Sequence, residues 1–250
     1  MFIDTHCHLS KNDYNDIKKI LDENRKNRVS PIIISGCDKN SILESLDYAN
    51  KISDVYVTIG YHPSEASVYH DEDIELLQKQ LMNKKVIGVG EIGLDYHYGK
   101  EDRLQQISLF EKQLLIAEKL HLPVVIHSRD ATYDTIQTLK KYSVRGVIHC
   151  FNGSIETARE YIKMGFVLGI GGVITFKNSN LGSVVAQLPL DKIVLETDSP
   201  YLTPAPYRGQ QNSSKYIPLV AKKVSECQNV TLDEVERITT QTAKTVFRLD

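Results

Sequence analysis

The chain has 250 residues, of which 41% are hydrophobic and 25% are charged, and its formal net charge is −2. This composition supports a full hydrophobic core. The near-neutral charge excludes a general attraction to nucleic acid, so any contact with a polyanion has to be local or to run through bound cations. The four cysteines form no Cys-x-x-Cys pair, and no leader-like start or apolar run of ~18 residues is present, so we expect a cytoplasmic protein with free thiols.

The first half of the chain alternates short β-branched runs with segments of helical periodicity. Each run ends in glycine or polar residues, as strands that precede helices commonly do. Strands are predicted at residues 2–5, 31–35, 55–59 and 86–89. Helices are predicted after them at residues 13–27, 39–51, 71–82 and 101–120.

The second half repeats the same alternation. Strands are predicted at residues 123–126, 146–148, 166–170 and 192–195, and helices at 131–140, 154–164, 181–188, 214–226 and 231–247. Ser154 and Thr231 have the residue type of helix N-caps. Eight strand–helix units in one chain of this length predict an α/β protein with a (β/α)8 TIM barrel, as a single domain over residues 1–250. A doubly wound open sheet is the alternative.

The first predicted strand runs into the sequence DTHCH at residues 4–8. Side chains alternate along a strand, so His6 and His8 share one face, about 7 Å apart, and two imidazoles so placed can bind one metal ion. Asp4 lies on the same face and is a candidate to orient a ligand. The alternative is a buried strand that carries two incidental histidines.

Residues of the metal-binding type also follow other predicted strands. They are His62, Glu91, His127, His149 and Asp198. In a barrel, the carboxyl ends of the strands meet on one face, where active sites form. Any one of these residues taken singly could be a polar residue of the barrel core. Their joint placement with the histidines of the first strand predicts a metal centre.

The ligand types suit two divalent ions, Mg²⁺, Mn²⁺ or Zn²⁺, because imidazoles favour Zn²⁺ and Mn²⁺ while carboxylates admit Mn²⁺ and Mg²⁺. Our interpretation has Glu91 bridge the two ions. The remaining ligands are His6, His8 and Asp198 for one ion and His127 and His149 for the other. Two ions about 4 Å apart can hold the attacking and leaving oxygens of a displacement, and Asp198 can take the proton of the attacking water. Glu91 and Asp198 are therefore the predicted catalytic residues.

Four residues around this centre are candidates for substrate binding. Arg129 could bind a phosphate, with a surface salt bridge as the alternative. His62 could form a hydrogen bond with the substrate or stabilise its own turn. Tyr207 and Arg208 could stack a base and neutralise a phosphate, with a solvated loop as the alternative. Glu196, on the inward face of the eighth strand, is either a supporting acid or a core residue.

Six motifs occur in order along the chain: DTHCHL at 4–9, GYHP at 60–63, GEIGLD at 90–95, HSRDA at 127–131, HCF at 149–151 and ETDSP at 196–200. Together they resemble the TatD-like deoxyribonucleases, a family of the amidohydrolase-like barrel superfamily. The resemblance implies that His6, His8, Glu91, His127, His149 and Asp198 are the metal ligands. It also implies a cytoplasmic, metal-dependent deoxyribonuclease that acts as a 3′–5′ exonuclease in DNA repair or breakdown.

The chain departs from this family pattern at the substrate edge. Asn152 stands where Ser or Thr is usual, and residues 208–214 lack a lysine and an acid that are familiar there. We expect DNA, as single-stranded ends, to be the partner of a monomeric enzyme. The alternatives are an amidohydrolase or esterase for a small substrate, and a non-catalytic scaffold stabilised by metal.

Overall fold

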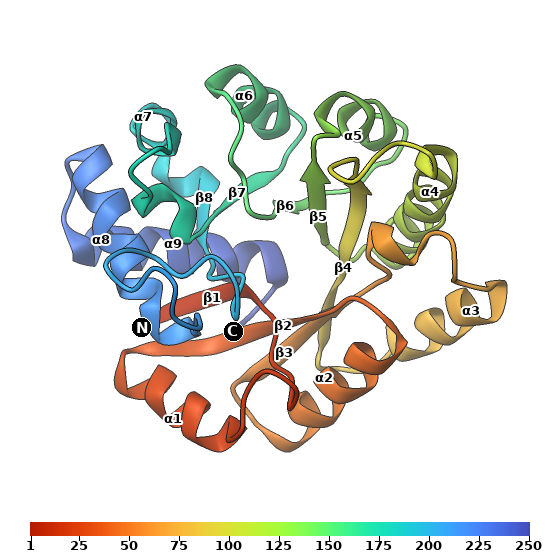
Figure 1. Ribbon diagram of the computed structural model, residues 1–250, viewed down its shortest axis with the longest axis horizontal. Coiled ribbons are helices and arrows are strands. Elements are labelled where there is room, and N and C mark those ends of the chain that lie inside the picture. The colour runs from red at the N-terminus through yellow and green to blue at the C-terminus, as the bar shows by residue number, and fades with distance from the viewer. The chain divides into compact units, whose positions relative to one another are not determined.

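Eight strands alternate with helices along the chain in the computed structural model, which describes residues 1–250 (Figure 1). The strands are β1 (Phe2–Cys7), β2 (Val29–Gly36), β3 (Val55–Ile59), β4 (Val86–Asp95), β5 (Val124–Arg129), β6 (Gly146–Ile148), β7 (Val167–Ile170) and β8 (Ile193–Leu195). They form one sheet in the sequential order β1 to β8. This is the order of a (β/α)8 barrel, whereas a doubly wound sheet would break it. The predicted fold class is confirmed.

The helices follow the strands as the sequence predicts. They are α1 (Ile17–Lys26), α2 (Lys39–Lys51), α3 (Asp71–Gln80), α4 (Arg103–Leu120), α5 (Thr132–Leu139), α6 (Ile155–Lys163), α7 (Leu181–Val185), α8 (Ile217–Gln228) and α9 (Leu232–Phe247). Three short 3-10 turns were not predicted: η1 (Pro63–Glu65), η2 (Gly172–Thr175) and η3 (Leu190–Lys192). A fourth, η4 (Ser214–Tyr216), forms the first turn of the helix predicted at residues 214–226. The predicted N-caps Ser154 and Thr231 are confirmed, since each side chain accepts a backbone N–H of its helix. No helix has both the length and the apolar character needed to cross a membrane.

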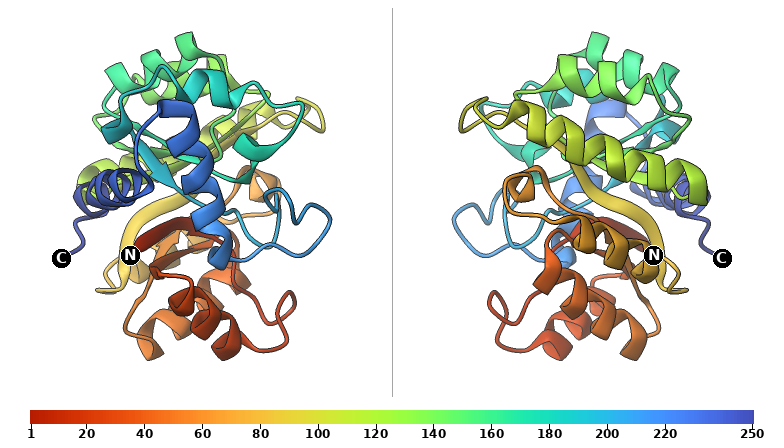
Figure 2. Two further views of the ribbon diagram at one scale, coloured as in Figure 1. Left: turned by 90° about the vertical axis from the view of Figure 1, so that its left-hand side faces the viewer. Right: turned by 90° about the vertical axis from the view of Figure 1, so that its right-hand side faces the viewer.

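The chain divides into two compact units, and the first comprises residues 1–34 and 150–250. In this unit β8 lies next to β1, because the backbone N–H of Asp198 donates to the carbonyl of His6 at 3.0 Å and the Thr5 hydroxyl donates to that of Leu195. Helix α9 packs against both β1 and β8 (Figure 2). The end of β8 is thereby held beside the histidines of β1.

The second unit comprises residues 35–149 and contains β3 to β6. Helix α4, the longest of the chain, runs beside β4 (Figures 1 and 2). Its residues Phe110 and Leu114 are fully buried, as are Ile92 and Leu94 of β4. Burying side chains of this size stabilises a fold by about 1.5–3 kcal/mol each. This packing fixes the strand that carries Glu91.

Strand β4 is longer than predicted, because it continues through the glycine-rich stretch to Asp95. Gly93 adopts φ +148°, and a Cβ there would lie 2.0 Å from the carbonyl oxygen of His127. Only glycine allows β4 to run this close to β5 at that level. Glu91 was predicted to follow its strand and instead lies inside it, and His127 likewise lies inside β5.

Candidate metal centre

The first unit brings three of the predicted ligands together at the ends of β1 and β8. The Nε2 atoms of His6 and His8 lie 3.2 Å apart. Oδ1 of Asp198 lies 3.6 Å from Nε2 of His6 and 3.4 Å from Nε2 of His8. His6 lies in β1 and His8 directly follows it, and both imidazoles lie on one side of the chain, as the sequence predicts.

Buried hydrogen bonds position this group. Asp4 is fully buried, and its carboxylate accepts hydrogen bonds from the backbone N–H and the hydroxyl of Thr197 at 3.0 and 2.6 Å. It also accepts from the backbone N–H of His6 at 3.3 Å. Burial raises the pKa of Asp4 to about 7, against the lowering effect of these hydrogen bonds. Asp4 thus ties β1 to the residue before Asp198 and acts on the backbone of His6 rather than on its ring.

The second unit brings together the other three predicted ligands, from β4, β5 and the residue after β6. Oε1 of Glu91 lies 2.5 Å from Nδ1 of His127 and 3.7 Å from Nε2 of His149. The side chains of Glu91 and His149 are 5% and 4% exposed, so water competes little for these contacts. The three donor atoms lie close enough together to hold one ion.

The second ring nitrogen of His127 contacts Asp95, a residue that the sequence reasoning did not select. Nε2 of His127 lies 3.0 Å from Oδ2 of Asp95. Burial alone would lower the pKa of His127, but the charge of Glu91 and the hydrogen bonds to both carboxylates raise it to about 9. Burial would raise the pKa of Asp95, but the hydrogen bonds from the His127 ring and the His97 backbone, together with the charges of His127 and Arg129, lower it. The imidazole is thus held at both of its nitrogens.

The donor sets fit divalent ions. Neighbouring ligands at ~2.0–2.2 Å from an ion are separated by about 2.8–3.6 Å, with octahedral coordination at the short end of this range and tetrahedral coordination at the long end. The three separations in the first unit, 3.2 to 3.6 Å, match this spacing. In the second unit, Glu91 and His127 share a hydrogen bond, so their joint binding of an ion requires loss of the shared proton. Imidazole nitrogens and carboxylate oxygens suit Zn²⁺ and Mn²⁺, and the carboxylates also admit Mg²⁺.

His62 was predicted either to form a hydrogen bond with the substrate or to stabilise its own turn, and its geometry is compatible with both. Its Nδ1 accepts the backbone N–H of Ser64 at 3.1 Å, which stabilises the turn at η1. Its Nε2 lies 4.0 Å from Oε1 of Glu91. The ring therefore supports its own turn with one nitrogen and faces the ligand cluster of the second unit with the other.

The other three residues predicted to bind substrate, Arg129, Tyr207 and Arg208, are exposed. Arg129 ends β5, and its guanidinium lies 5.7 Å from the ring centre of Tyr98, an 89% exposed residue that the sequence reasoning did not select. Tyr207 stacks on Tyr216 with ring centres 4.9 Å apart. Arg208 lies over the ring of Phe176 at 3.7 Å and donates to the carbonyl of Thr203. The loop after β8 is therefore ordered by stacking.

Three further contacts involve Glu196 and two cysteines. Glu196 is fully buried and accepts the backbone N–H of Cys150 at 2.6 Å, so it fixes the backbone after His149. Cys37 places its Sγ 3.7 Å from Oε2 of Glu91, a contact that no sequence motif indicated. Cys7 is buried, and its thiol donates to the carbonyl of Ile33.

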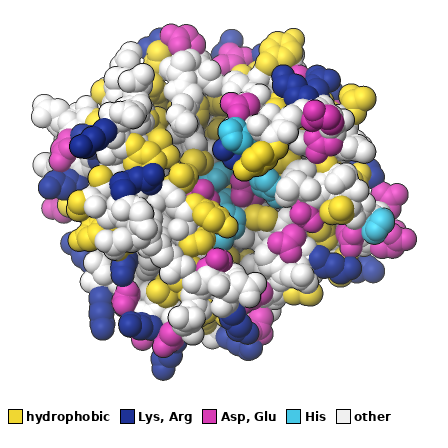
Figure 3. Space-filling view, viewed as in Figure 1, with side chains coloured by type: hydrophobic (Ala, Val, Ile, Leu, Met, Phe, Trp, Pro, Cys, Tyr) yellow, Lys and Arg dark blue, Asp and Glu magenta, His cyan; other side chains and the backbone are white.

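Surface charge is mixed on the face that Figure 3 displays. Lysine and arginine side chains are interspersed there with acidic ones, and histidine side chains are visible on the same face. This mixture of signs agrees with the net charge of −2.

Comparison with known proteins identifies the family. The family model "TatD related DNase" matches residues 3–248. The chain is 37% identical over 255 residues to YabD of Bacillus subtilis, named an uncharacterized metal-dependent hydrolase, and the match covers 100% of both chains. The crystal structure of the TatD homologue YjjV from Escherichia coli K12 matches with a TM-score of 0.93 and 30% identity, covering 100% of this chain and 98% of that one.

A more distant structure agrees in fold. A TatD family hydrolase from Entamoeba histolytica matches with a TM-score of 0.88 at 23% identity, over 100% of this chain and 98% of that one. The family model spans nearly the whole chain, and the relative from Bacillus is similar over its full length. The chain therefore belongs to the TatD family of metal-dependent hydrolases.

Proposed function

We propose that this hydrolase is a deoxyribonuclease that cleaves phosphodiester bonds of DNA with the help of two divalent ions. In this proposal one ion is held by His6, His8 and Asp198 and the other by Glu91, His127 and His149. Bound Mg²⁺, Mn²⁺ or Zn²⁺ supplies Lewis-acid chemistry and neutralises phosphate charge. The bridging role of Glu91 between the ions stays a prediction.

The observation that carries the proposal is the position of Arg129. Residues 127 and 129 share one face of β5, so the guanidinium follows the His127 imidazole on the same side of the strand. Asp95, which contacts that imidazole, pairs in register with Arg129 across β4 and β5. A planar guanidinium matches a phosphodiester in charge and shape, whereas a small neutral amide or ester would offer it no negative charge.

The side chains of the first unit supply the proton chemistry and a contact for a terminal base. Asp198 is 16% exposed and lies against two imidazoles, a suitable place for a base that accepts the proton of the attacking water. Tyr201 is 60% exposed, with its ring centre 6.3 Å from that of His8, and can stack on an unpaired base. This supports action on single-stranded ends, and we propose the 3′–5′ direction. The four free cysteines support a cytoplasmic location.

The test combines a substrate panel with a variant of Asp198. Purified protein with added Mg²⁺, Mn²⁺ or Zn²⁺ is assayed on single-stranded DNA, duplex DNA, RNA and simple esters. We expect hydrolysis of single-stranded DNA from the 3′ end. Loss of the base in Asp198→Ala should lower turnover by at least about 100-fold, with an unchanged far-ultraviolet circular dichroism spectrum.

An exposed carboxylate outside the ligand clusters provides a control variant, and two outcomes would contradict the proposal. Asp47→Ala removes an exposed carboxylate that pairs with Lys51 on α2, and it should leave turnover unchanged. Unchanged DNA hydrolysis in Asp198→Ala would refute the proposed proton chemistry. Activity on esters alone would replace the nuclease with an esterase or amidohydrolase.

A further inference from the structure

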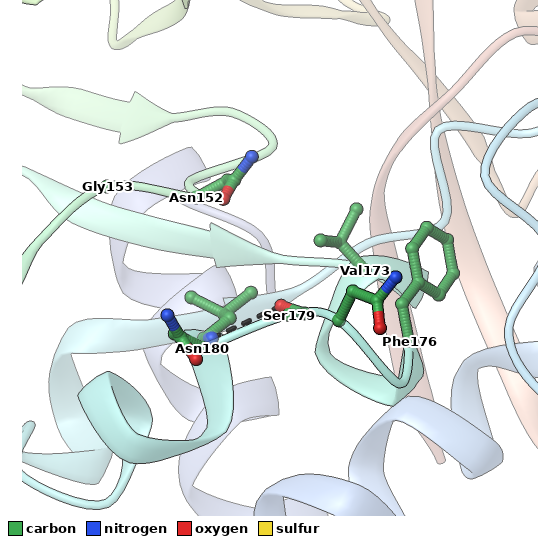
Figure 4. A pocket seen from close by; sticks show the side chains of 8 residues that line it. Asn152, Gly153, Val173, Phe176, Ser179 and Asn180 are labelled. Atoms are coloured by element: carbon green, nitrogen blue, oxygen red, sulfur yellow. Dashed lines mark hydrogen bonds between the residues drawn. The ribbon is translucent and has the colours of Figure 1, made fainter.

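A pocket of about 360 Å³ lies in the first unit, beside the segments that follow β6 and β7 (Figure 4). Asn152, from the segment after β6, forms one side of it, and Val173 and Phe176 come from η2 and the residue after it. Gly153, next to Asn152, and residues 178–181, at and before the start of α7, complete its lining. The volume is at the small end of the range for small-molecule sites, about 300–1,000 Å³.

The chemistry of the lining is neutral and mixed. None of the residues that line the pocket carries a charge. Three asparagines supply amides, each with donor and acceptor atoms side by side, while Val173, Phe176 and Leu181 supply apolar surface. A free phosphate or carboxylate would find no cation among these residues. A planar heterocycle with donors and acceptors on its edge would find partners for both its faces and its edge.

The wall of the pocket contacts the loop that follows Asp198 in the chain. The Phe176 ring carries the guanidinium of Arg208 on one face at 3.7 Å, and the backbone N–H of Ala205 donates to the hydroxyl of Thr175 at 2.8 Å. At Gly172 a Cβ would lie 2.1 Å from the carbonyl oxygen of Leu202, so the loop packs directly on η2. These contacts place an exposed cation next to a neutral pocket, the pairing that a nucleotide presents with its phosphate and its base.

We propose that this pocket binds one unpaired nucleobase of the DNA substrate, a role that rests on the deoxyribonuclease function proposed above. Every base presents a donor and an acceptor as neighbours on its edge, and an asparagine amide can satisfy either order by turning over. The pocket therefore accepts all four bases. A base enters it only when it is unstacked and unpaired, so the pocket favours single-stranded over duplex DNA.

The test measures binding without hydrolysis. Protein freed of metal with EDTA is titrated with a fluorescent single strand of about five nucleotides, either intact or with an abasic site at each position in turn. For one position we expect the abasic site to weaken binding about tenfold or more, the size of the contribution of an amide–base contact. In the double variant Asn152→Leu, Asn180→Leu, the intact strand should bind as weakly as that abasic strand. Strands that differ in the base at that position should bind within about threefold of one another.

Asn50→Leu, an equivalent change on the exposed side of α2, should behave as the wild type. The proposed role of the pocket would be refuted if the wild type bound intact and abasic strands equally well. It would also be refuted if the double variant still bound the intact strand more tightly. If the protein hydrolysed DNA but bound intact and abasic strands equally well, the deoxyribonuclease function would be supported and the role of the pocket refuted. If the wild type bound the intact strand more tightly, the double variant lost this preference, and the protein hydrolysed no DNA, base binding by the pocket would be supported and the deoxyribonuclease function refuted.

Discussion

At the level of single residues, the contact between Asp95 and His127 matters most for the second ligand cluster. A carboxylate on the far nitrogen of an imidazole fixes the orientation of the ring and the nitrogen that is left for an ion. Nδ1 of His127 faces Glu91, and its Nε2 faces Asp95 at 3.0 Å. Asp95 is therefore a positioning residue for a predicted ligand.

Replacing Asp95 should weaken metal binding more than it disturbs the fold. In Asp95→Asn and Asp95→Ala we expect the affinity of the second unit for Mn²⁺ or Zn²⁺ to fall by about 10- to 100-fold, because the ring of His127 loses its anchor. Isothermal titration of the metal-free protein measures this. Asp130→Asn changes a comparable contact, to the exposed ring of His97, and should bind metal as the wild type does. Equal affinity in all the proteins would show that Asp95 does not position His127.

The same pair illustrates what the sequence can predict about the site. The ligand-type residues could be selected because each lies at or near the end of an apolar run. Asp95 could not, because its role depends on the register that sets Gly93 opposite His127 and Asp95 opposite Arg129. A pattern along one strand does not contain its register with the next strand. The ligand roles themselves stay predictions.

At the level of elements, prediction was most accurate where periodicity and boundary residues agree. The ranges of α2, β3 and β6 match their predictions. Helix α1 begins later than predicted, because Asp16 caps it by accepting the backbone N–H of Lys19 at 3.0 Å. The second half of β4 was missed, because its glycines lower strand propensity even though the tertiary contact with β5 requires one of them.

Helices α4 and α5 are joined by an ion pair whose contribution should depend on pH. Arg103 donates to both carboxylate oxygens of Asp134, at 2.6 and 2.9 Å, and this hydrogen bonding lowers the pKa of Asp134. A lowered folded-state pKa gives stability that is complete above the unfolded pKa, about 3.9, and is lost as pH falls through the folded value. Asp134→Asn should therefore reduce the free energy of unfolding by about 1 kcal/mol at neutral pH, since Arg103 is partly exposed.

Urea unfolding at several pH values checks this dependence. The difference between wild type and Asp134→Asn should be constant above about pH 5 and shrink below about pH 4. Asp22→Asn, at the more exposed pair with Arg25 on α1, should show little change at any pH. A difference between Asp134→Asn and the wild type that grows as the pH falls would contradict the assigned direction of the pKa shift.

At the level of the whole molecule, the predicted ligands divide between the two compact units. His6, His8 and Asp198 belong to the first unit, and Glu91, His127 and His149 to the second. The alternation of strands and helices was enough to predict the (β/α)8 class, because a sequential parallel order follows from repeated strand–helix units. This division could not be predicted, since it depends on packing density rather than on any break in composition. That the chain behaves as one domain stays a prediction.

Because each unit carries its own donor set, the number of bound ions should respond to each set separately. We expect metal analysis of the wild type to give two ions per chain. His8→Ala and His149→Ala should each retain one, and the double variant none, because each substitution removes an imidazole from only one cluster. His70→Ala, outside both clusters, should retain two. Each lost ion should also lower the melting temperature measured in excess metal, because an ion bound to the native state stabilises it. A single ion in the wild type, or loss of both ions on either single substitution, would refute two separate donor sets.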